Sequence, residues 1–350
     1  TENDGDTKWF WAVADANNTV FWTKGAELGR PYITYSNIAK QDDTDGIPFK
    51  YDTESPEITG VGLLRLATDV YKQGTTTRYA ASEIKQYVTD LGLEWSSANN
   101  MVFGKDYALM YVMVEVNEKT GMNATSPVAL DYITLGSSDI WVTDPDSNNK
   151  YTYYLGPFDL SGKDTENVTL TFTAKDEANK SGTKEKSIIV DNSADITISD
   201  VSPSADEIAS GKFSYRGQVS DAQSSVTRVE YYIPKSAENA ALSGASTDAA
   251  KKTLLDSKTF IHIEKATSIQ WTIDFNNFND DVLKYTTNGV DVIVDEGFAG
   301  YKTENDLYRI PVWFKVTDSV GNTGYVTDNI ITYDPNEDRP KVYITDPEIK

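Results

Sequence analysis

Residues 312–324, VWFKVTDSVGNTG, decide the fold. Successive side chains of a β-strand point to opposite faces, so a strand over the first half of this stretch places the apolar residues Val312 and Phe314 on the same face. Asp318 and Asn322 come next, and side chains of these types bond to their own backbone in tight turns. A second alternating strand, NIITYD, follows. The stretch therefore predicts two antiparallel strands joined by a short turn.

The same strand-and-turn pattern occurs twice more, as WFWAVADANNT at 9–19 and LTFTAKDEANKSG at 170–182. Each copy leads into an acidic boundary and then a new alternating strand. The boundary residues are 139 and 143 residues apart, which indicates repeated modules that each begin just after a boundary. The boundary residues are Asp52, Asp191 and Asp334, and the turn residues of the two further copies are Asp15 with Asn18 and Asp176 with Asn179.

Short strands separated by polar turns fill the rest of each module. Segments 108–135 and 213–233 are predicted to be corresponding hairpins, and about seven strands per module is typical of an antiparallel sandwich. The chain has 21 Tyr, 12 Phe and 7 Trp, and this aromatic content favours strands over helices. We therefore predict an all-β fold of tandem immunoglobulin-like β-sandwich modules with one short helical insertion.

The helical insertion is predicted near 82–95, SEIKQYVTDLGLEW, where four apolar residues recur at helical spacing. Ser82 is the expected N-cap and Gly92 the expected end of the helix. The Ala/Ser-rich segment 234–252 of the other module leaves two interpretations open, a short helix or a mobile loop. The four apolar residues are Ile84, Tyr87, Val88 and Leu91.

The boundaries divide the chain into four parts. Residues 1–51 are predicted to be the C-terminal half of an immunoglobulin-like module, and residues 52–191 a full module that carries the helical insertion. Residues 192–334 are predicted to form a second full module, and residues 335–350 the first strand of a following one. The chain is thus expected to be a segment of a longer protein.

Composition narrows the classes of partner. The 54 Asp and Glu residues exceed the 32 Lys and Arg residues, which gives a net charge of −22. Such a surface repels phosphate backbones and anionic lipids, so neither nucleic acid nor a membrane surface is an expected partner. No apolar run reaches the length of a membrane span, so we expect no membrane insertion within this chain. The absence of cysteine argues against a disulfide-stabilised secreted domain.

The residues required by common catalytic sites are missing. One histidine and no cysteine leave no zinc finger, cysteine nucleophile or two-histidine metal site. His262 is interpreted as a structural or surface residue rather than part of a Ser-His-Asp triad. A nucleophile elbow, a phosphate-binding loop and a dinucleotide fingerprint are all absent from the sequence. The prediction is that the chain is not an enzyme.

The closing motif of the last module carries a family resemblance. DSVGNTG at 318–324, followed by DPNEDRP at 334–340, resembles tandem bacterial immunoglobulin-like, or cadherin-like, repeats of large surface proteins and adhesins. DEANKSG at 176–182, followed by DNSAD at 191–195, is a weaker match, because it lacks both the glycine within the turn and the proline of the linker. The resemblance implies a non-catalytic extracellular structural or adhesive region, a stalk or adhesin repeat, on a bacterial cell surface. It also implies a monomeric rod segment.

Two functional hypotheses remain open at this stage. The first is the stalk or adhesin, with a host or cell-surface protein or glycan as partner. The alternative is a carbohydrate- or protein-ligand-binding module of a larger secreted protein. Trp22, Trp95 and Trp141 bear on the choice, because rings near loops either stack on sugars or close the ends of a sandwich.

Calcium is the one cofactor that the resemblance suggests. DPNEDRP is similar to the linker of cadherin-type repeats, where carboxylates from two modules surround the ion, and calcium prefers six to eight oxygen ligands. We expect the site at this last junction only, with a solvated acidic linker as the alternative. The predicted ligands are Asp334, Asn336, Asp338 and Asp318. Segments 41–52 and 144–150 are interpreted as an acidic loop and a hairpin turn instead of calcium loops.

Overall fold

The computed structural model describes residues 54–143, 145–146, 149–275, 300–305 and 307–334, together with the backbone of several strands outside these ranges. Near the N-terminus three strand pairs are described, β1 with β2, β3 with β6 and β4 with β5. Their bounds are β1 (Glu2–Asp4), β2 (Thr7–Trp9), β3 (Ala26–Glu27), β4 (Tyr32–Ser36), β5 (Asp42–Gly46) and β6 (Lys50–Tyr51).

The first sandwich consists of two four-stranded sheets, ordered β11-β12-β9-β7 and β10-β13-β14-β8. Neighbouring strands are antiparallel except β8, which runs parallel to β14. The first sheet contains β7 (Glu57–Leu66), β9 (Leu109–Asn117), β11 (Ile140–Thr143) and β12 (Lys150–Asp159). The second contains β8 (Met101–Phe103), β10 (Val128–Leu130), β13 (Glu166–Lys175) and β14 (Ser181–Val190).

The second sandwich has the same plan. Its sheets are ordered β15-β17-β21-β20 and β16-β26-β25-β18-β19, and again one short strand, β16, runs parallel to its neighbour β26. The first sheet contains β15 (Ile196–Ser202), β17 (Phe213–Asp221), β20 (Lys265–Ala266) and β21 (Gln270–Phe275). The second contains β16 (Ile208–Ala209), β18 (Val226–Tyr232), β19 (Ile261–His262), β25 (Tyr308–Asp318) and β26 (Thr323–Tyr333). Strands β22 (Asn277–Asn279), β23 (Val282–Thr287) and β24 (Val290–Val294) form a separate sheet.

Alternation along the strands builds each core. In β9, Met110, Val112 and Val114 are fully buried between the two sheets. In β25, Val312, Phe314 and Val316 are fully buried in the same way, as the deciding stretch predicts. The protein is therefore an all-β chain with tandem immunoglobulin-like sandwiches.

The prediction that segments 108–135 and 213–233 form hairpins is wrong, because the two strands of each segment are not paired with each other. β9 and β10 lie in different sheets, and so do β17 and β18. Each pair forms an arch across the sandwich instead, because both strands turn an apolar face toward the shared core from opposite sides.

Helices cover one outer face of each sandwich. Helix α1 (Ala81–Leu91) follows β7 and buries Ile84 and Val88 against the β7–β9–β12 sheet. Its end at Gly92, in the left-handed conformation with φ 62°, confirms the prediction. The N-cap is Ala80 and not Ser82, since the Glu83 carboxylate accepts a hydrogen bond from the Ala80 N–H at 2.8 Å.

The Ala/Ser-rich segment of the second sandwich forms two helices, so the loop interpretation is wrong. They are α2 (Ser236–Gly244) and α3 (Asp248–Asp256), and Thr247 caps α3 by accepting a hydrogen bond from the Ala250 N–H. Leu242 and Leu255 pack on Trp313 of β25, on the outer face of the five-stranded sheet. Two short 3₁₀ turns, η1 (Lys105–Tyr107) and η2 (Ser137–Asp139), lie in the first sandwich.

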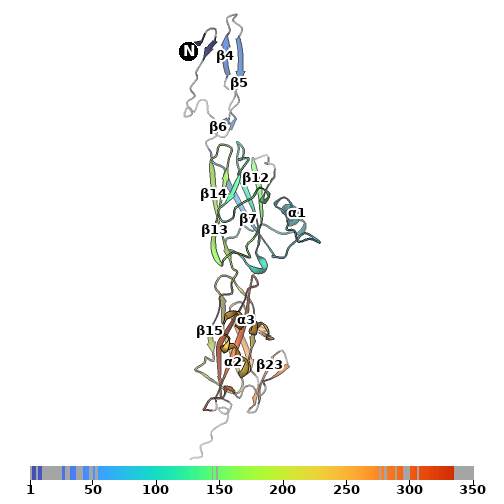
Figure 1. The fold of residues 1–350 in the computed structure, drawn as a ribbon, viewed down its shortest axis with the longest axis vertical. Coiled ribbons are helices and arrows are strands. Elements are labelled where there is room, and N and C mark those ends of the chain that lie inside the picture. The colour runs from blue at the N-terminus through green and yellow to red at the C-terminus, as the bar shows by residue number, and fades with distance from the viewer. Residues whose placement is uncertain are drawn as a thin grey trace, which may run out of the picture.

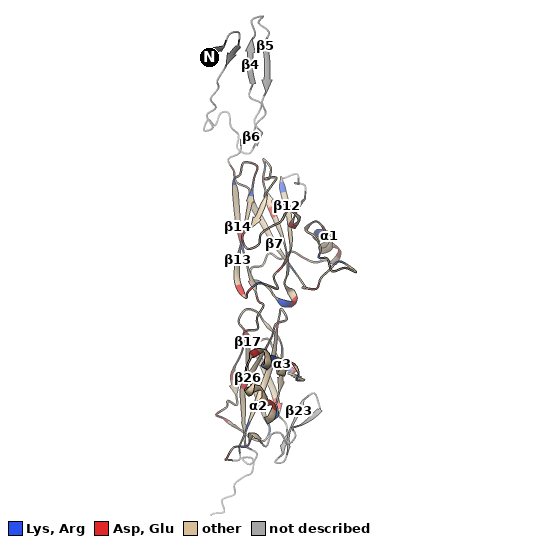
Figure 2. Cartoon of the chain, in the orientation of Figure 1, with Lys and Arg blue, Asp and Glu red and all other residues tan. Residues whose placement is uncertain are grey.

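The two sandwiches lie end to end along the long axis of the molecule (Figure 1). Asp and Glu residues occur along both of them (Figure 2). Among the described residues, no helix is long and apolar enough to cross a membrane.

Candidate metal centre at the junction of the sandwiches

The turn between β25 and β26 is held by Asp318, as the sequence predicts. One oxygen of the buried carboxylate, Oδ1, accepts hydrogen bonds from the N–H groups of Val320 and Asn322, both at 2.9 Å. The other oxygen, Oδ2, accepts one from the Asn322 side-chain amide at 2.8 Å. The turn is thereby fixed at the end of the second sandwich that faces the first.

Asp191 reaches this turn from the first sandwich. It directly follows β14, its backbone N–H bonds to the Phe103 carbonyl at 2.7 Å, and its side chain has no exposed surface. The Asn322 amide group donates to the Asp191 backbone oxygen at 2.9 Å and to Oδ1 of its carboxylate at 3.3 Å. Asn322 therefore joins the last strand of one sandwich to the turn of the other.

Asp221 supplies a third carboxylate from the opposite sheet of the second sandwich. It ends β17, and its Oδ1 accepts hydrogen bonds from the N–H groups of Gln223 and Ser224 at 3.0 and 2.8 Å. This local turn orients the half-buried side chain. The side-chain oxygen of Gln223 is buried in the same turn and has no hydrogen-bond partner.

One carboxylate oxygen each from Asp191, Asp221 and Asp318 lies within 4.8 Å of the other two. The Oδ2 atoms of Asp191 and Asp221 are buried and have no hydrogen-bond partner. None of the salt bridges formed by the described residues neutralises these three groups. Burial raises the pKa of Asp191 to about 6; repulsion from Asp221 and Asp318 adds to this rise, while hydrogen bonds from Ser224 and Ser193 oppose it.

The donor set fits a hard divalent cation. All available ligand atoms are oxygens, and at least two of them are unpartnered, whereas zinc prefers nitrogen or sulfur. A cation would remove both the repulsion among the carboxylates and the cost of burying an unpaired charge at Asp191. Calcium, with its flexible oxygen coordination, is the ion that suits this arrangement best.

Direct contacts hold the same junction together. Val320, fully buried, accepts a hydrogen bond through its backbone oxygen from the Asp106 N–H at 2.9 Å, and the Lys105 ammonium group donates to the Gly321 oxygen at 2.7 Å. Gly321 has φ 91°, and a Cβ there would collide with the Asp106 carboxylate. Gly104 is equally confined, because a Cβ would overlap the Asp191 backbone oxygen. The turn at 318–322 thus docks closely against η1 of the first sandwich.

The predicted calcium ligands do not form one group. β25 and β26 are antiparallel, with Thr317 opposite Thr323 and Tyr308 opposite Tyr333. Asp318 therefore lies at one end of the hairpin, and Asp334, whose N–H bonds to the Ala209 oxygen at 2.9 Å, lies at the other. Asn336 and Asp338 are outside the described residues. A site at 334–338 remains a prediction.

Of the three carboxylates of this group, the sequence predicts Asp318 as a calcium ligand but not Asp191 or Asp221. Asp191 directly follows the apolar strand SIIV, and an acid in that position is the sequence signal that could identify it. Asp221 was hidden because its segment was interpreted as a hairpin, in which its carboxylate would belong to an ordinary turn. Only the three-dimensional arch brings it to the junction.

The other sequence candidates have ordinary places in the fold. His262 is exposed on β19. Asp42–Gly46 is strand β5, paired with β4, so this part of segment 41–52 does not form the predicted loop. β11 and β12 are antiparallel, and the Asn149 N–H bonds to the Asp146 oxygen between them, which confirms the hairpin turn. Trp22, Asp15 and Asn18 are outside the described residues.

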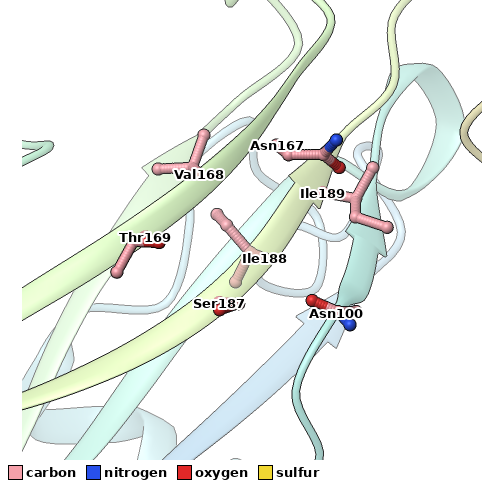
Figure 3. A pocket seen from close by; sticks show the side chains of 7 residues that line it. All are labelled: Asn100, Asn167, Val168, Thr169, Ser187, Ile188 and Ile189. Atoms are coloured by element: carbon pink, nitrogen blue, oxygen red, sulfur yellow. The ribbon is translucent and has the colours of Figure 1, made fainter.

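Two shallow troughs lie on the first sandwich. One, of about 340 Å³, crosses the outer face of β13 and β14 and is lined by neutral side chains, including Asn100, Asn167 and Ser187 (Figure 3). The second, of about 360 Å³, lies beside β10 and is lined by Thr125, Ser126 and apolar residues among others. Neither trough is lined by an ionisable side chain that could serve as a general acid or base.

No protein-family description and no curated protein matches this chain. Solved structures to which it is similar include the fibronectin(III)-like modules of Clostridium thermocellum CbhA, at 12% identity and a TM-score of 0.22, covering 69% of this chain and 91% of that one. A 1.5-MDa bacterial ice-binding adhesin has 15% identity and a TM-score of 0.27, with 67% and 61% covered. The protocadherin GammaB4 extracellular domain has 11% identity and a TM-score of 0.24, with 88% and 38% covered. At these identities and scores the similarity tells us nothing about ligands.

Proposed function

We propose that this chain is a non-catalytic structural region of an extracellular bacterial surface protein, a stalk or adhesin repeat whose sandwiches are fixed end to end by a divalent cation. The observation that carries the proposal is the buried group of Asp191, Asp221 and Asp318, with unpartnered oxygens, at the contact between two sandwiches. A rod that presents a binding region needs stiff junctions, and a cation between modules provides stiffness.

The extracellular location is supported by the low calcium affinity that is expected of such a site. Calcium sites of extracellular modules have dissociation constants of about 10⁻⁴–10⁻³ M, so they fill outside cells and stay empty within them. The net charge of −22 keeps a long modular chain soluble and disfavours anionic partners.

The test is calorimetric titration of the chain with CaCl₂ after treatment with chelator. We expect binding with a dissociation constant near 10⁻⁴–10⁻³ M and, at a few millimolar calcium, a gain of about 1–2 kcal/mol in unfolding free energy. Asp221→Asn removes one carboxylate oxygen but keeps an oxygen that can accept the hydrogen bonds from the Gln223 and Ser224 N–H groups, and calcium binding should weaken at least tenfold. The matched control is Asp206→Asn, an exposed acid of the same sandwich, which should bind calcium like the wild type.

Equal binding heats for wild type and Asp221→Asn would contradict the proposal. So would the absence of any calcium-dependent heat or shift in melting temperature. In that case the junction would be held by the contacts of Asn322, Val320 and Lys105 alone.

A further inference from the structure

Three aromatic side chains form a row across the outer face of the β11-β12-β9-β7 sheet. Trp141 lies opposite Tyr154, Tyr154 opposite Met113, and Met113 opposite Gly62. Trp95 lies over Gly62, where a Cβ would come within 2.9 Å of the Trp95 Cβ. The Tyr154 ring centroid is 5.7 Å from that of Trp95 and 5.5 Å from that of Trp141. The row therefore runs Trp95–Tyr154–Trp141.

This aromatic row divides the outer face into a covered and an open half. On one side helix α1 packs over the sheet and the strand residues are apolar and buried. On the other side the same strands carry polar or small residues that are partly exposed. The buried residues of the covered half are Leu64, Leu66, Leu109 and Tyr111, and the partly exposed residues of the open half are Gly60, Glu115, Thr152 and Thr143.

The open half offers hydrogen-bonding groups without net charge. Lys150 forms a salt bridge with Glu115 at 2.6 Å, and both side chains are about one-third exposed, at 34% and 28%. The Glu115 carboxylate also lies close to Tyr154, whose pKa is raised by burial and then by that negative charge. Thr152 adds a hydroxyl group beside Glu115, its neighbour across the strands. Donors and acceptors thus lie directly beside the rings.

The second sandwich shows what a purely structural aromatic cluster looks like in this protein. There Trp313 has no exposed surface, because α2 and α3 cover it with Leu242 and Leu255. In the first sandwich both indole rings remain partly exposed, and the segment that leads to Trp95 also exposes Leu91 and Leu93, at 56% and 36%. Trp95 and Trp141 are therefore partly exposed at the edge of the apolar cluster beneath α1, while Tyr154 between them is buried in that cluster.

We propose that the aromatic row and the polar half beside it bind a neutral glycan. The C–H face of a pyranose ring stacks on an indole, while its hydroxyl groups bond to Glu115, Lys150 and Thr152. Because the two charges beside the row compensate each other, the site suits an uncharged ligand, and the chain's net charge of −22 repels acidic polysaccharides. The proposal is independent of the cation at the junction.

The test is a ¹H–¹⁵N NMR titration of the chain with neutral sugars. The sugars are glucose, galactose and mannose, together with oligomers built from each of them. The indole N–H signals of Trp95 and Trp141 are assigned from the spectra of Trp95→Phe and Trp141→Phe. We expect at least one oligomer to shift these two signals in a saturable way, and the buried Trp271 and Trp313 signals to stay in place. An acidic oligosaccharide of the same length should cause no shift.

Trp141→Ala should weaken binding of that oligomer at least tenfold, while Trp141→Phe, which keeps a ring, loses less than this. Tyr71→Ala is the matched control, since it removes a ring that is 41% exposed in the same sandwich but outside the row. The proposal is overturned if no neutral oligomer shifts the two indole signals. It is also overturned if Trp141→Ala and Tyr71→Ala bind alike.

Discussion

Apart from the additional strand β19, the two sandwiches share one strand order, but they differ in how they close their last turn. In the first, Oδ1 of Asp176 accepts a hydrogen bond from the Lys180 N–H at 2.8 Å, and Asn179 takes the left-handed conformation with φ 64°. In the second, Asp318 bonds to the Asn322 N–H in the same way, and Gly321 is the left-handed residue. The backbone plan is therefore the same in both turns.

The difference lies in the residue that follows the left-handed position. Asn322 has a short amide that reaches Asp191 of the neighbouring sandwich, whereas Lys180 has a cationic chain at the equivalent place. The glycine before Asn322 also lets the turn approach Asp106 closely. The strand pattern thus sets the fold, and in the second sandwich Asn322 and Gly321 allow the last turn to dock onto its neighbour.

The insertions show a second difference. α1 lies between β7 and β8 and covers the sheet of β7, while α2 and α3 lie between β18 and β19 and cover the opposite sheet. A sandwich therefore accepts a helical cover on either outer face, provided that the strands beneath carry apolar residues outward. Leu64 and Tyr111 do so in the first sandwich and Trp313 in the second.

The largest effect is expected from Asp318→Ala. Three hydrogen-bond donors at Val320 and Asn322 would lose their acceptor in a buried turn, which costs about 3–5 kcal/mol of unfolding free energy in the second sandwich. Urea unfolding of the chain, followed by the fluorescence of its tryptophans, should show an early transition for the second sandwich only. A loss below about 1 kcal/mol would mean that the turn is not held by this carboxylate.

Asn322→Ala tests the connection between the sandwiches. It removes the amide that bridges Asp191 and Asp318 but keeps the turn's backbone bonds, so we expect a loss of about 1–3 kcal/mol. The matched change in the first sandwich, Lys180→Ala, should cost less, because it keeps the hydrogen bond that the Lys180 backbone N–H donates to Asp176. Equal losses in both variants, measured by urea unfolding, would remove the distinction between the turns.

The pH dependence of the junction follows from Asp191. Since its folded-state pKa of about 6 lies above the ordinary value of 3.8, the folded chain binds this proton more tightly than the unfolded chain. The resulting stabilisation is fully present below about pH 4 and is lost as the pH rises through 6. In chelator, the stability of wild type relative to Asp191→Asn should fall by roughly 1–2 kcal/mol between pH 5 and 7.5. A constant difference over this range would contradict the assignment.

The smallest effect comes from exchanging the left-handed residues. Asn179→Gly should stabilise the first sandwich by up to about 1 kcal/mol, because glycine adopts a positive φ without steric cost. Gly321→Asn should destabilise the second by more than that, since its Cβ meets Asp106. Melting temperatures of the two variants check this; opposite signs are expected, and like signs would show that the docking of Gly321 is unimportant.

Periodicity in the sequence was sufficient to predict the strands, the turn at Asp318, the helix end at Gly92 and the all-β class, because these depend on neighbours along the chain. The arches β9–β10 and β17–β18 were mistaken for hairpins, since both arrangements have the same alternation. The candidate metal centre was found only in part. Asp221 lies close to Asp191 because two sheets pack within the second sandwich and the two sandwiches pack end to end. The spacing of these residues along the sequence does not predict this proximity.

The most direct test of the account compares wild type with Asp191→Asn at pH 7.5, by unfolding free energy in chelator and in calcium. In chelator, the substitution removes a buried charge that repels Asp221 and Asp318, so Asp191→Asn should be the more stable protein. In a few millimolar calcium, wild type should gain about 1–2 kcal/mol and the variant should gain nothing. If Asp191→Asn is the less stable protein in chelator and still responds to calcium, the junction is not the cation site.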